Sequence, residues 1–79
     1  MEAAVMVQME EKMYYDKLLT IVREANQFQS YIVFEMNGMV INGKSLISVS
    51  TFLKQKNQMT VRAVGNDAKD AVEAIKKLI

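Results

Sequence analysis

The sequence of 79 residues contains no histidine, no cysteine, no proline and no tryptophan. Without histidine, the chain lacks the commonest general base, the commonest metal ligand and any phosphohistidine chemistry. Because cysteine is absent as well, we expect no zinc or iron site, and we predict no metal and no cofactor. The lack of cysteine also fits a reducing compartment, so a cytoplasmic protein is expected.

The chain also lacks a strong charge of one sign and a long apolar run. Ten basic and nine acidic residues give a formal net charge of +1, which provides no long-range field to attract nucleic acid or an anionic membrane. No apolar stretch approaches the length of a membrane span, and the first residues lack the basic region of a signal peptide. Hydrophobic residues make up 51% of the chain, so we expect a single globular domain over residues 1–79 that binds neither nucleic acid nor membrane.

Hydrophobic periodicity predicts four strands, over residues 4–9, 30–36, 39–42 and 59–64. It predicts helices over residues 16–26 and 45–53 and a last helix after the break at residues 65–66. Asp16 is the expected N-cap of the first helix, and a start at Tyr14 is the alternative. Asn37-Gly38 favours a type I′ hairpin turn, whose two central residues need positive φ. Residues 10–12 and 54–58 are expected to form polar turns.

The order β-α-β-β-α-β-α predicts an α+β fold, in which a four-stranded antiparallel sheet carries three helices on one face and leaves the other open. Alternation along the strands assigns a set of apolar residues to the helix side: Val5, Val7, Ile32, Phe34, Ile41, Met59 and Val61. Their neighbours include a candidate open-face patch: Met6, Tyr31, Val33, Val40 and Val64. One interpretation of this patch is a surface that binds a protein partner, which could be a second copy of the chain in a homodimer. The alternative is that these residues are present only because β-branched and aromatic residues favour strands.

Ser45 stands where the sequence turns from strand to helix, directly after Gly43 and Lys44. Serine is among the best N-caps, so a structural cap is the simpler interpretation. The alternative is a regulated phosphorylation site, because free N–H groups at the helix start and the adjacent Lys44 favour a phosphate. The candidate partner-binding residues around this position are Lys44, Ser45, Leu46, Ile47 and Ser50.

The order of elements and three strings resemble the family of histidine-containing phosphocarrier proteins (HPr) of the bacterial sugar phosphotransferase system. The strings are REANQF, NGMVINGKS and GNDAKDAVEAI. The middle string is the most specific, because family members typically share its Asn-Gly turn, Asn42 and the Lys44-Ser45 pair. The resemblance covers nearly the whole chain and implies the HPr-like open-faced sandwich.

The family's activity belongs to a different segment. Its members carry a phosphoryl group on a histidine at the start of the first helix, in a Gly-Leu/Ile-His-Ala-Arg-Pro motif. Counting back from REANQF places the histidine position on Tyr14 and the arginine position on Asp16, with Lys12 and Lys17 at the glycine and proline positions. A phenol is a poor nucleophile at neutral pH, and a carboxylate repels phosphate where the motif has a guanidinium. We therefore predict no catalytic residue and no phosphohistidine carrier.

The resemblance implies a noncatalytic member, comparable to the catabolite-repression HPr proteins, which lack the histidine and keep the serine. Such a member acts by protein binding, with HPr kinase or a LacI-type transcription regulator as partner and Ser45 as the switch. Two alternatives stay open: a phosphocarrier that uses another residue, and an assembly module that pairs through the open sheet face. Several residues of the second helix also depart from the small, Met-rich surface typical of the family: Ser48, Ser50, Thr51 and Phe52.

Overall fold

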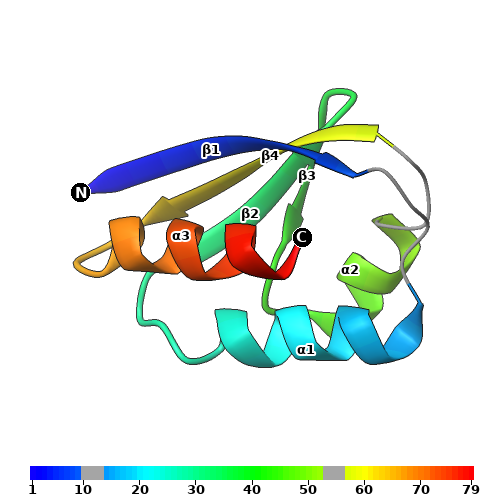
Figure 1. Cartoon of the computed structure of the whole chain (residues 1–79). Helices are drawn as coiled ribbons and strands as arrows, with labels where there is room; N and C mark the ends of the chain where they lie inside the picture. The colour runs from blue at the N-terminus through cyan, green and yellow to red at the C-terminus, as the bar shows by residue number, and fades with distance from the viewer. Residues whose placement is uncertain (10–13, 53–56) are drawn as a thin grey trace.

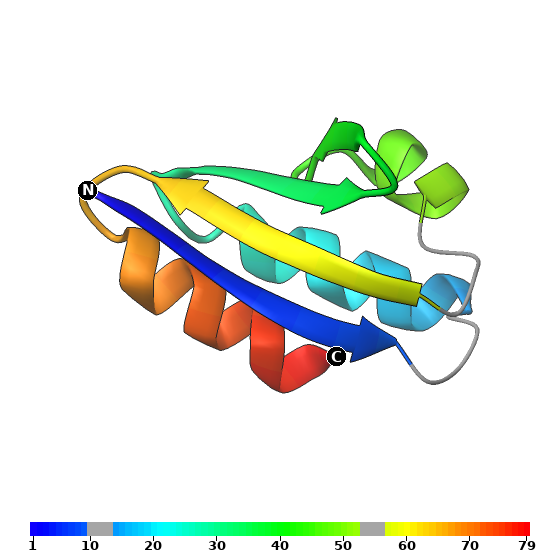
Figure 2. The ribbon, with the colours of Figure 1, turned by 90° about the horizontal axis from the view of Figure 1, so that it is seen from above.

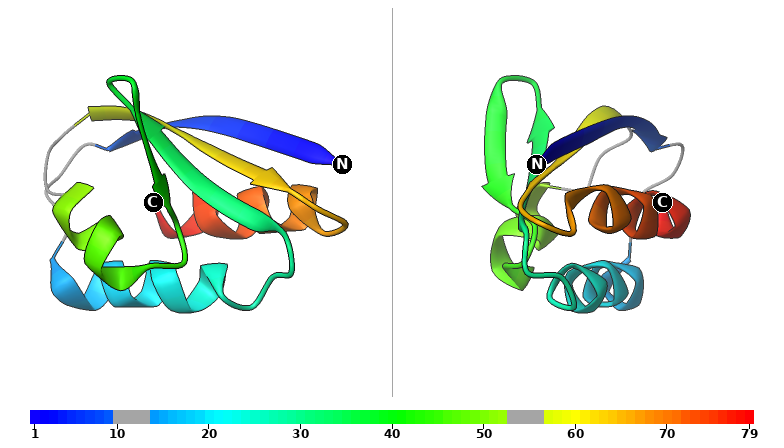
Figure 3. Two further views of the ribbon diagram at one scale, coloured as in Figure 1. Left: turned by 180° about the vertical axis from the view of Figure 1, so that it is seen from behind. Right: turned by 90° about the vertical axis from the view of Figure 1, so that its left-hand side faces the viewer.

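The computed structural model describes residues 1–9, 14–52 and 57–79. Its elements are β1 (Glu2–Met9), α1 (Tyr15–Ala25), β2 (Tyr31–Met36), β3 (Met39–Asn42), α2 (Leu46–Phe52), β4 (Asn57–Val64) and α3 (Ala68–Leu78). The strands form one antiparallel sheet in the order β1-β4-β2-β3, and the helices lie on one side of it (Figures 1 and 3). The predicted α+β architecture is confirmed. None of the described helices is long and apolar enough to cross a membrane.

The hydrophobic core lies between the sheet and the helices. The strand residues assigned to the helix side are buried or, for Val5 and Ile41, partly buried against the core. α1 and α3 complete the core with apolar stripes at three- and four-residue spacing: Leu18, Ile21, Val22 and Ala25, and Ala68, Ala71, Val72 and Ile75. Period-two strands and period-3.6 helices therefore bury the faces that their sequences predict.

The hairpin between β2 and β3 turns at Asn37-Gly38. Asn37 has φ of 53° and Gly38 has φ of 79°, so both central residues adopt the positive φ that a type I′ turn requires. A Cβ at Gly38 would meet no heavy atom within 4 Å, so the glycine is favoured by its φ and not by lack of space. The predicted turn is confirmed.

β1 begins at Glu2, two residues earlier than predicted. Glu2 lies opposite Val64, and the N–H of Gly65 donates to the carbonyl of Met1 at 2.8 Å. These first residues are ordered by a partner strand about sixty positions away, and local periodicity carries no signal of that pairing.

β4 begins at Asn57, so the prediction that residues 57 and 58 belong to a turn was wrong. Asn57 and Gln58 pair with Met9 and Gln8 across the β1–β4 ladder, which extends the strand beyond its apolar residues. The remainder of that predicted turn, the turn predicted over residues 10–12 and the predicted helix end at Leu53 lie outside the described residues.

Asp16 does not cap α1, so its assignment as the N-cap was wrong. The N-cap is Tyr14, whose carbonyl accepts the N–H groups of Lys17 and Leu18 at 3.1 Å each, and its side chain makes no capping hydrogen bond. Asp16 lies in the first turn, where its Oδ1 accepts the N–H of Lys17 at 2.9 Å. A carboxylate in the first turn interacts favourably with the helix dipole without acting as the cap, so helix geometry fits the earlier start.

Asp67 joins two loops that are far apart in the sequence. Its Oδ1 accepts the N–H of Ser30 at 2.9 Å and the Ser30 hydroxyl, and its Oδ2 accepts the N–H of Gln29 at 2.9 Å. Ser30 is only 1% exposed. The hydrogen bond from Ser30 and the backbone bonds favour the charged carboxylate, and they lower the pKa of Asp67.

The lowered pKa of Asp67 makes the stability of the protein depend on pH. A carboxyl whose pKa is lower in the folded state stabilises the fold above its ordinary value of 3.8, and this contribution is lost as the pH falls through the folded-state pKa. We expect Asp67→Asn to lower the urea midpoint at pH 7, with a difference from the wild type that shrinks below about pH 4. A difference that stays constant from pH 7 to pH 3 would contradict this assignment.

Candidate functional site

The segment that aligns with the carrier motif lies at the N-terminus of α1. Tyr14 and Tyr15 are 71% and 62% exposed. Asp16 and Lys17 line a shallow hollow of about 440 Å³ against the last turn of α3, where Lys77 lies. The ionisable side chains at this place are therefore a phenol, a carboxylate and two ammonium groups, and the chain has no histidine to supply an imidazole. Lys12 of the aligned motif lies outside the described residues.

Ser45 precedes α2 and occupies the N-cap position. Its carbonyl accepts the N–H of Val49 at 2.9 Å, and its Oγ accepts the N–H of Ser48 in a long bond of 3.4 Å. Ser45 is half-buried. The hydroxyl therefore serves as the predicted helix cap, and it lies among the first N–H groups of the helix.

Lys44 ties the start of α2 to the end of α1. Its Nζ donates to the carbonyl of Phe28 at 2.7 Å, and its own carbonyl accepts the side-chain amide of Asn26 at 3.2 Å. Its N–H donates to Oδ1 of Asn42 at 2.9 Å, which fixes the turn after β3. The ammonium group thus already has an acceptor, and a phosphate on Ser45 would have to compete with the Phe28 carbonyl for it.

Tyr14 and Ser45 precede different helices, α1 and α2. Tyr14 precedes the first turn of α1, whereas Asn26, which contacts Lys44, follows the last turn. At 1.5 Å per residue, the axial rise from residue 14 to residue 26 is about 18 Å, which separates Tyr14 from the residue that contacts Lys44.

Among the residues of α2 whose side chains the structure describes, Ile47 is the exposed apolar one. Ile47 is 81% exposed, whereas Leu46 packs partly against the core. The hydroxyls nearby bond back to helix carbonyls: Ser50 donates to Ile47 at 2.8 Å, and Thr51 donates to Ser48 at 2.8 Å. Because these hydroxyls already have acceptors, Ile47 is the group most available to a partner.

Figure 2 looks onto the side of the sheet that carries no helix. The five residues of the candidate open-face patch alternate with the residues that are buried against the helices, so they lie on this side. Tyr31 and Val64 are opposite each other and are 80% and 45% exposed. Met6 and Val40 are both 60% exposed, but they lie on β1 and β3, the two edge strands. Val33 is half-buried. Val33 follows Tyr31 on the same face of β2, so it adjoins the Tyr31–Val64 pair, whereas Met6 and Val40 lie apart on the edge strands.

Arg62 occupies the middle of the open face, opposite Val33. Its Nε and Nη2 donate to the two carboxylate oxygens of Glu35 at 2.9 and 3.2 Å, and its Nη1 donates to Glu2 at 3.2 Å. Bonding to Glu35 raises the pKa of the Arg62 guanidinium. Alternation along β2 and β4 is enough to put Glu35 and Arg62 on this face, but it does not predict the cluster, because the cluster depends on the order of the strands.

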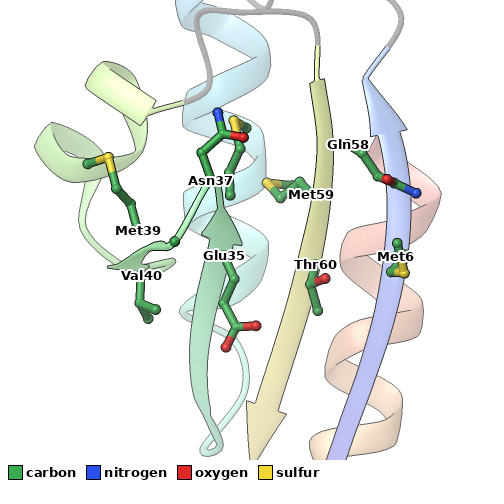
Figure 4. A pocket seen from close by; sticks show the side chains of 10 residues that line it. Met6, Glu35, Asn37, Met39, Val40, Gln58, Met59 and Thr60 are labelled. Carbon is green, nitrogen blue, oxygen red and sulfur yellow. The ribbon is translucent and has the colours of Figure 1, made fainter.

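The open face is hollowed near the hairpin, over a volume of about 560 Å³ (Figure 4). Met6 and Val40 line it from the two edge strands, with Glu35 and Thr60 between them. Its lining mixes apolar and polar side chains, and Glu35 within it is already paired with Arg62. Across the part of the chain that the structure describes, no group of three or more His, Cys, Asp or Glu residues could hold a metal ion.

An open-faced sandwich of this order, with an Asn-Gly hairpin and a Lys-Ser pair ahead of α2, has the architecture that the sequence resemblance implied. The family described as "PTS HPr component phosphorylation site" matches residues 2–79. The chain therefore belongs to the HPr family of the phosphotransferase system.

Solved structures agree with this assignment. The phosphocarrier protein HPr of Bacillus anthracis strain Ames is 25% identical, with a TM-score of 0.89 over 99% of this chain and 96% of that one. The Bacillus subtilis catabolite repression protein Crh, solved as a domain-swapped dimer, is 26% identical, with a TM-score of 0.77 over 91% of this chain and 84% of that one. The solution structure of Crh gives a TM-score of 0.60 at 26% identity, over 95% of each chain.

Proposed function

We propose that this HPr-family member is not a phosphocarrier, that it acts by binding other proteins in the cytoplasm, and that Ser45 is its regulatory phosphorylation site. One observation carries the first part. Tyr14 and Asp16 stand at the N-terminus of α1, where the family motif has histidine and arginine, and the chain contains no histidine. What remains of the family's phosphate chemistry is the Lys44-Ser45 pair before α2.

The chemistry at Tyr14 supports a loss of carrier activity. A carrier needs a nucleophile that forms a labile bond to phosphorus, and an aryl phosphate ester is too stable to pass its phosphoryl group on. The carboxylate of Asp16, two residues away, repels the incoming phosphate, and its Oδ1 already accepts the N–H of Lys17. The exposed tyrosines instead suit contacts with a protein partner.

The contacts of Lys44 suggest how phosphorylation of Ser45 would act. A phosphate at the N-cap is favoured by the first N–H groups of α2, and it attracts the nearby ammonium group. Lys44 would then exchange the neutral carbonyl of Phe28 for a charged oxygen, which is the stronger acceptor. This exchange loosens the tie between α1 and α2 beside the exposed Ile47.

The proposed partners are those that the family implies, HPr kinase and a LacI-type transcription regulator. The surface offered to them comprises Lys44, Ser45, Leu46, Ile47 and Ser50. Of these residues, Ile47 supplies apolar contact, and a phosphate on Ser45 would supply the charge. A partner that reads both features distinguishes the phosphorylated protein from the unmodified one.

Incubation with HPr kinase and ATP, followed by mass spectrometry, tests the switch. We expect one phosphate on Ser45 in the wild type and in the control Ser48→Ala, and none in Ser45→Ala. Loss of the cap costs about 0.5–1 kcal/mol, so Ser45→Ala is expected to remain folded. If the kinase phosphorylates a histidine-containing HPr but leaves Ser45 of this chain unmodified, the proposal that Ser45 is a phosphorylation switch is wrong.

Binding to an immobilised LacI-type regulator tests the partner surface. The phosphorylated wild type is expected to bind, whereas the unmodified protein and a phosphorylated Ile47→Ser variant bind more weakly. Equal retention of all three proteins would show that neither the phosphate nor Ile47 is recognised.

A further inference from the structure

β1 forms one edge of the sheet, and the phase of its ladder identifies the backbone groups that point outward. Met1 lies opposite Gly65 in the β1–β4 register and accepts the Gly65 N–H, so odd-numbered residues of β1 bond to β4. The N–H and C=O groups of the even-numbered residues therefore point away from β4. Among the described residues, none hydrogen-bonds to the outward backbone groups of Glu2, Ala4 or Met6.

The edge lacks the usual devices that prevent strand pairing. β1 has eight residues, contains no proline or lysine, and carries its single charge at Glu2. The opposite edge, β3, has only four residues. Natural proteins commonly protect an edge with charges, proline, a bulge or a short strand, so β1 is the edge that suits strand addition.

A hollow of about 280 Å³ lies along this edge, between β1 and α3. α3 runs beneath β1 in the same direction (Figure 1). Small apolar residues form the middle of the hollow: Ala3, Val5 and Val72. Charged residues of α3 form the rim: Lys69, Glu73 and Lys76. None of these three makes an ion pair with another described residue, so the rim has a net charge of +1 that is not neutralised.

We propose that this hollow binds a short extended peptide segment of a partner protein, which adds to the free edge of β1. The main chain of the segment pairs with the outward groups of Glu2, Ala4 and Met6. On the side that faces α3, an apolar residue packs against Val72, and an acidic residue on either side of it pairs with Lys69 and Lys76. This surface is separate from the α2 surface, so it does not depend on phosphorylation of Ser45.

The spacing of the lysines sets the spacing in the peptide. Lys69 and Lys76 are seven helical residues apart, or about 10.5 Å along the axis. Positions 1 and 5 of an extended peptide are about 13 Å apart and project from the same face as position 3. The probe is therefore acetyl-Glu-Thr-Val-Thr-Glu-amide, and its charge-inverted control is acetyl-Lys-Thr-Val-Thr-Lys-amide.

Titration of the ¹⁵N-labelled full chain with each peptide tests the proposal. We expect saturable amide shifts in β1 around Ala4 and in α3 around Val72. The acidic peptide is expected to bind at least about fivefold more tightly than the basic one, which is the effect of about one exposed ion pair. The absence of saturable shifts, or shifts confined to the open face or to α2, would overturn the proposal.

Two variants and one control make the test specific. Lys69→Glu combined with Lys76→Glu is expected to reverse the preference between the peptides, whereas Lys77→Glu, on the other flank of α3, leaves it unchanged. Ala4→Pro removes one outward N–H, which an edge strand tolerates, and is expected to abolish binding. If the Ala4→Pro variant does not fold, the peptide preference of the double lysine variant alone decides whether the proposal holds. An unchanged preference in the double lysine variant, or a dimer of the chain that already covers β1, would refute the peptide site.

Discussion

Gly65→Ala is expected to destabilise the protein strongly. Gly65 has φ of +151°, a conformation that residues with a Cβ rarely adopt, and this strain alone costs about 1–3 kcal/mol. A Cβ at this position would lie 2.5 Å from Oγ, 2.7 Å from Cα and 2.9 Å from Cβ of Ser30. Because Asp67 holds both the N–H and the hydroxyl of Ser30, the serine has little freedom to move. We expect a loss of about 2–4 kcal/mol in the free energy of unfolding.

Urea denaturation of Gly65→Ala and Gly38→Ala separates the cost of backbone strain at positive φ from the cost of a steric clash with Ser30. Gly38 also has positive φ, but a Cβ there meets nothing within 4 Å, so its replacement is expected to cost only about 1–2 kcal/mol. Equal losses in the two variants would show that the approach of Gly65 to Ser30 contributes nothing. In that case, the tie between the two loops would not explain why glycine is needed at residue 65.

Tyr14→His combined with Asp16→Arg is expected to restore phosphate uptake from enzyme I and phosphoenolpyruvate. Tyr14 already occupies the N-cap of α1 with an exposed side chain, so a histidine there supplies the missing nucleophile next to the first-turn N–H groups. The arginine replaces a repelling carboxylate with a bidentate donor. Tyr14→His alone is expected to take up less phosphate, because Asp16 remains.

The matched control for this gain of function is Tyr15→His combined with Asp16→Arg. Tyr15 is also exposed, but it is the first residue of the helix proper rather than the N-cap. We expect acid-labile label on the Tyr14 variant and little on the Tyr15 variant. Equal labelling would mean that the N-cap position has no special role, whereas no labelling of either would place the defect outside these two residues.

Local patterns in the sequence predict most of the fold. The burial of Phe34 and Ile75, the positive φ at Asn37 and the cap at Ser45 all follow from short-range rules, because the periodicity or chemistry that fixes them lies within a few residues. The start of β1 and the first residues of β4 were not predicted. Glu2 is ordered by pairing with Val64 at the end of β4, and Asn57 is ordered by pairing with Met9 at the end of β1.

The candidate sites were less predictable, because side-chain partners come from distant elements. The sequence placed Lys44 next to Ser45 and suggested that it would neutralise a phosphate, whereas its ammonium group bonds to the carbonyl of Phe28. The open face was expected to show an apolar patch, and Arg62 with its two carboxylates lies at its centre. Both arrangements depend on the order of the strands and on loop geometry, which residue patterns do not encode locally.

The claim that this HPr-family chain carries no phosphoryl group is tested most directly on the wild-type protein. It is incubated with enzyme I and labelled phosphoenolpyruvate, with a histidine-containing HPr in a parallel reaction, and label is measured without acid treatment so that labile bonds survive. We predict label on the HPr and none on this chain. Stoichiometric label on this chain, on Asp16, Tyr14 or any other residue, would contradict the proposal and make it a phosphocarrier.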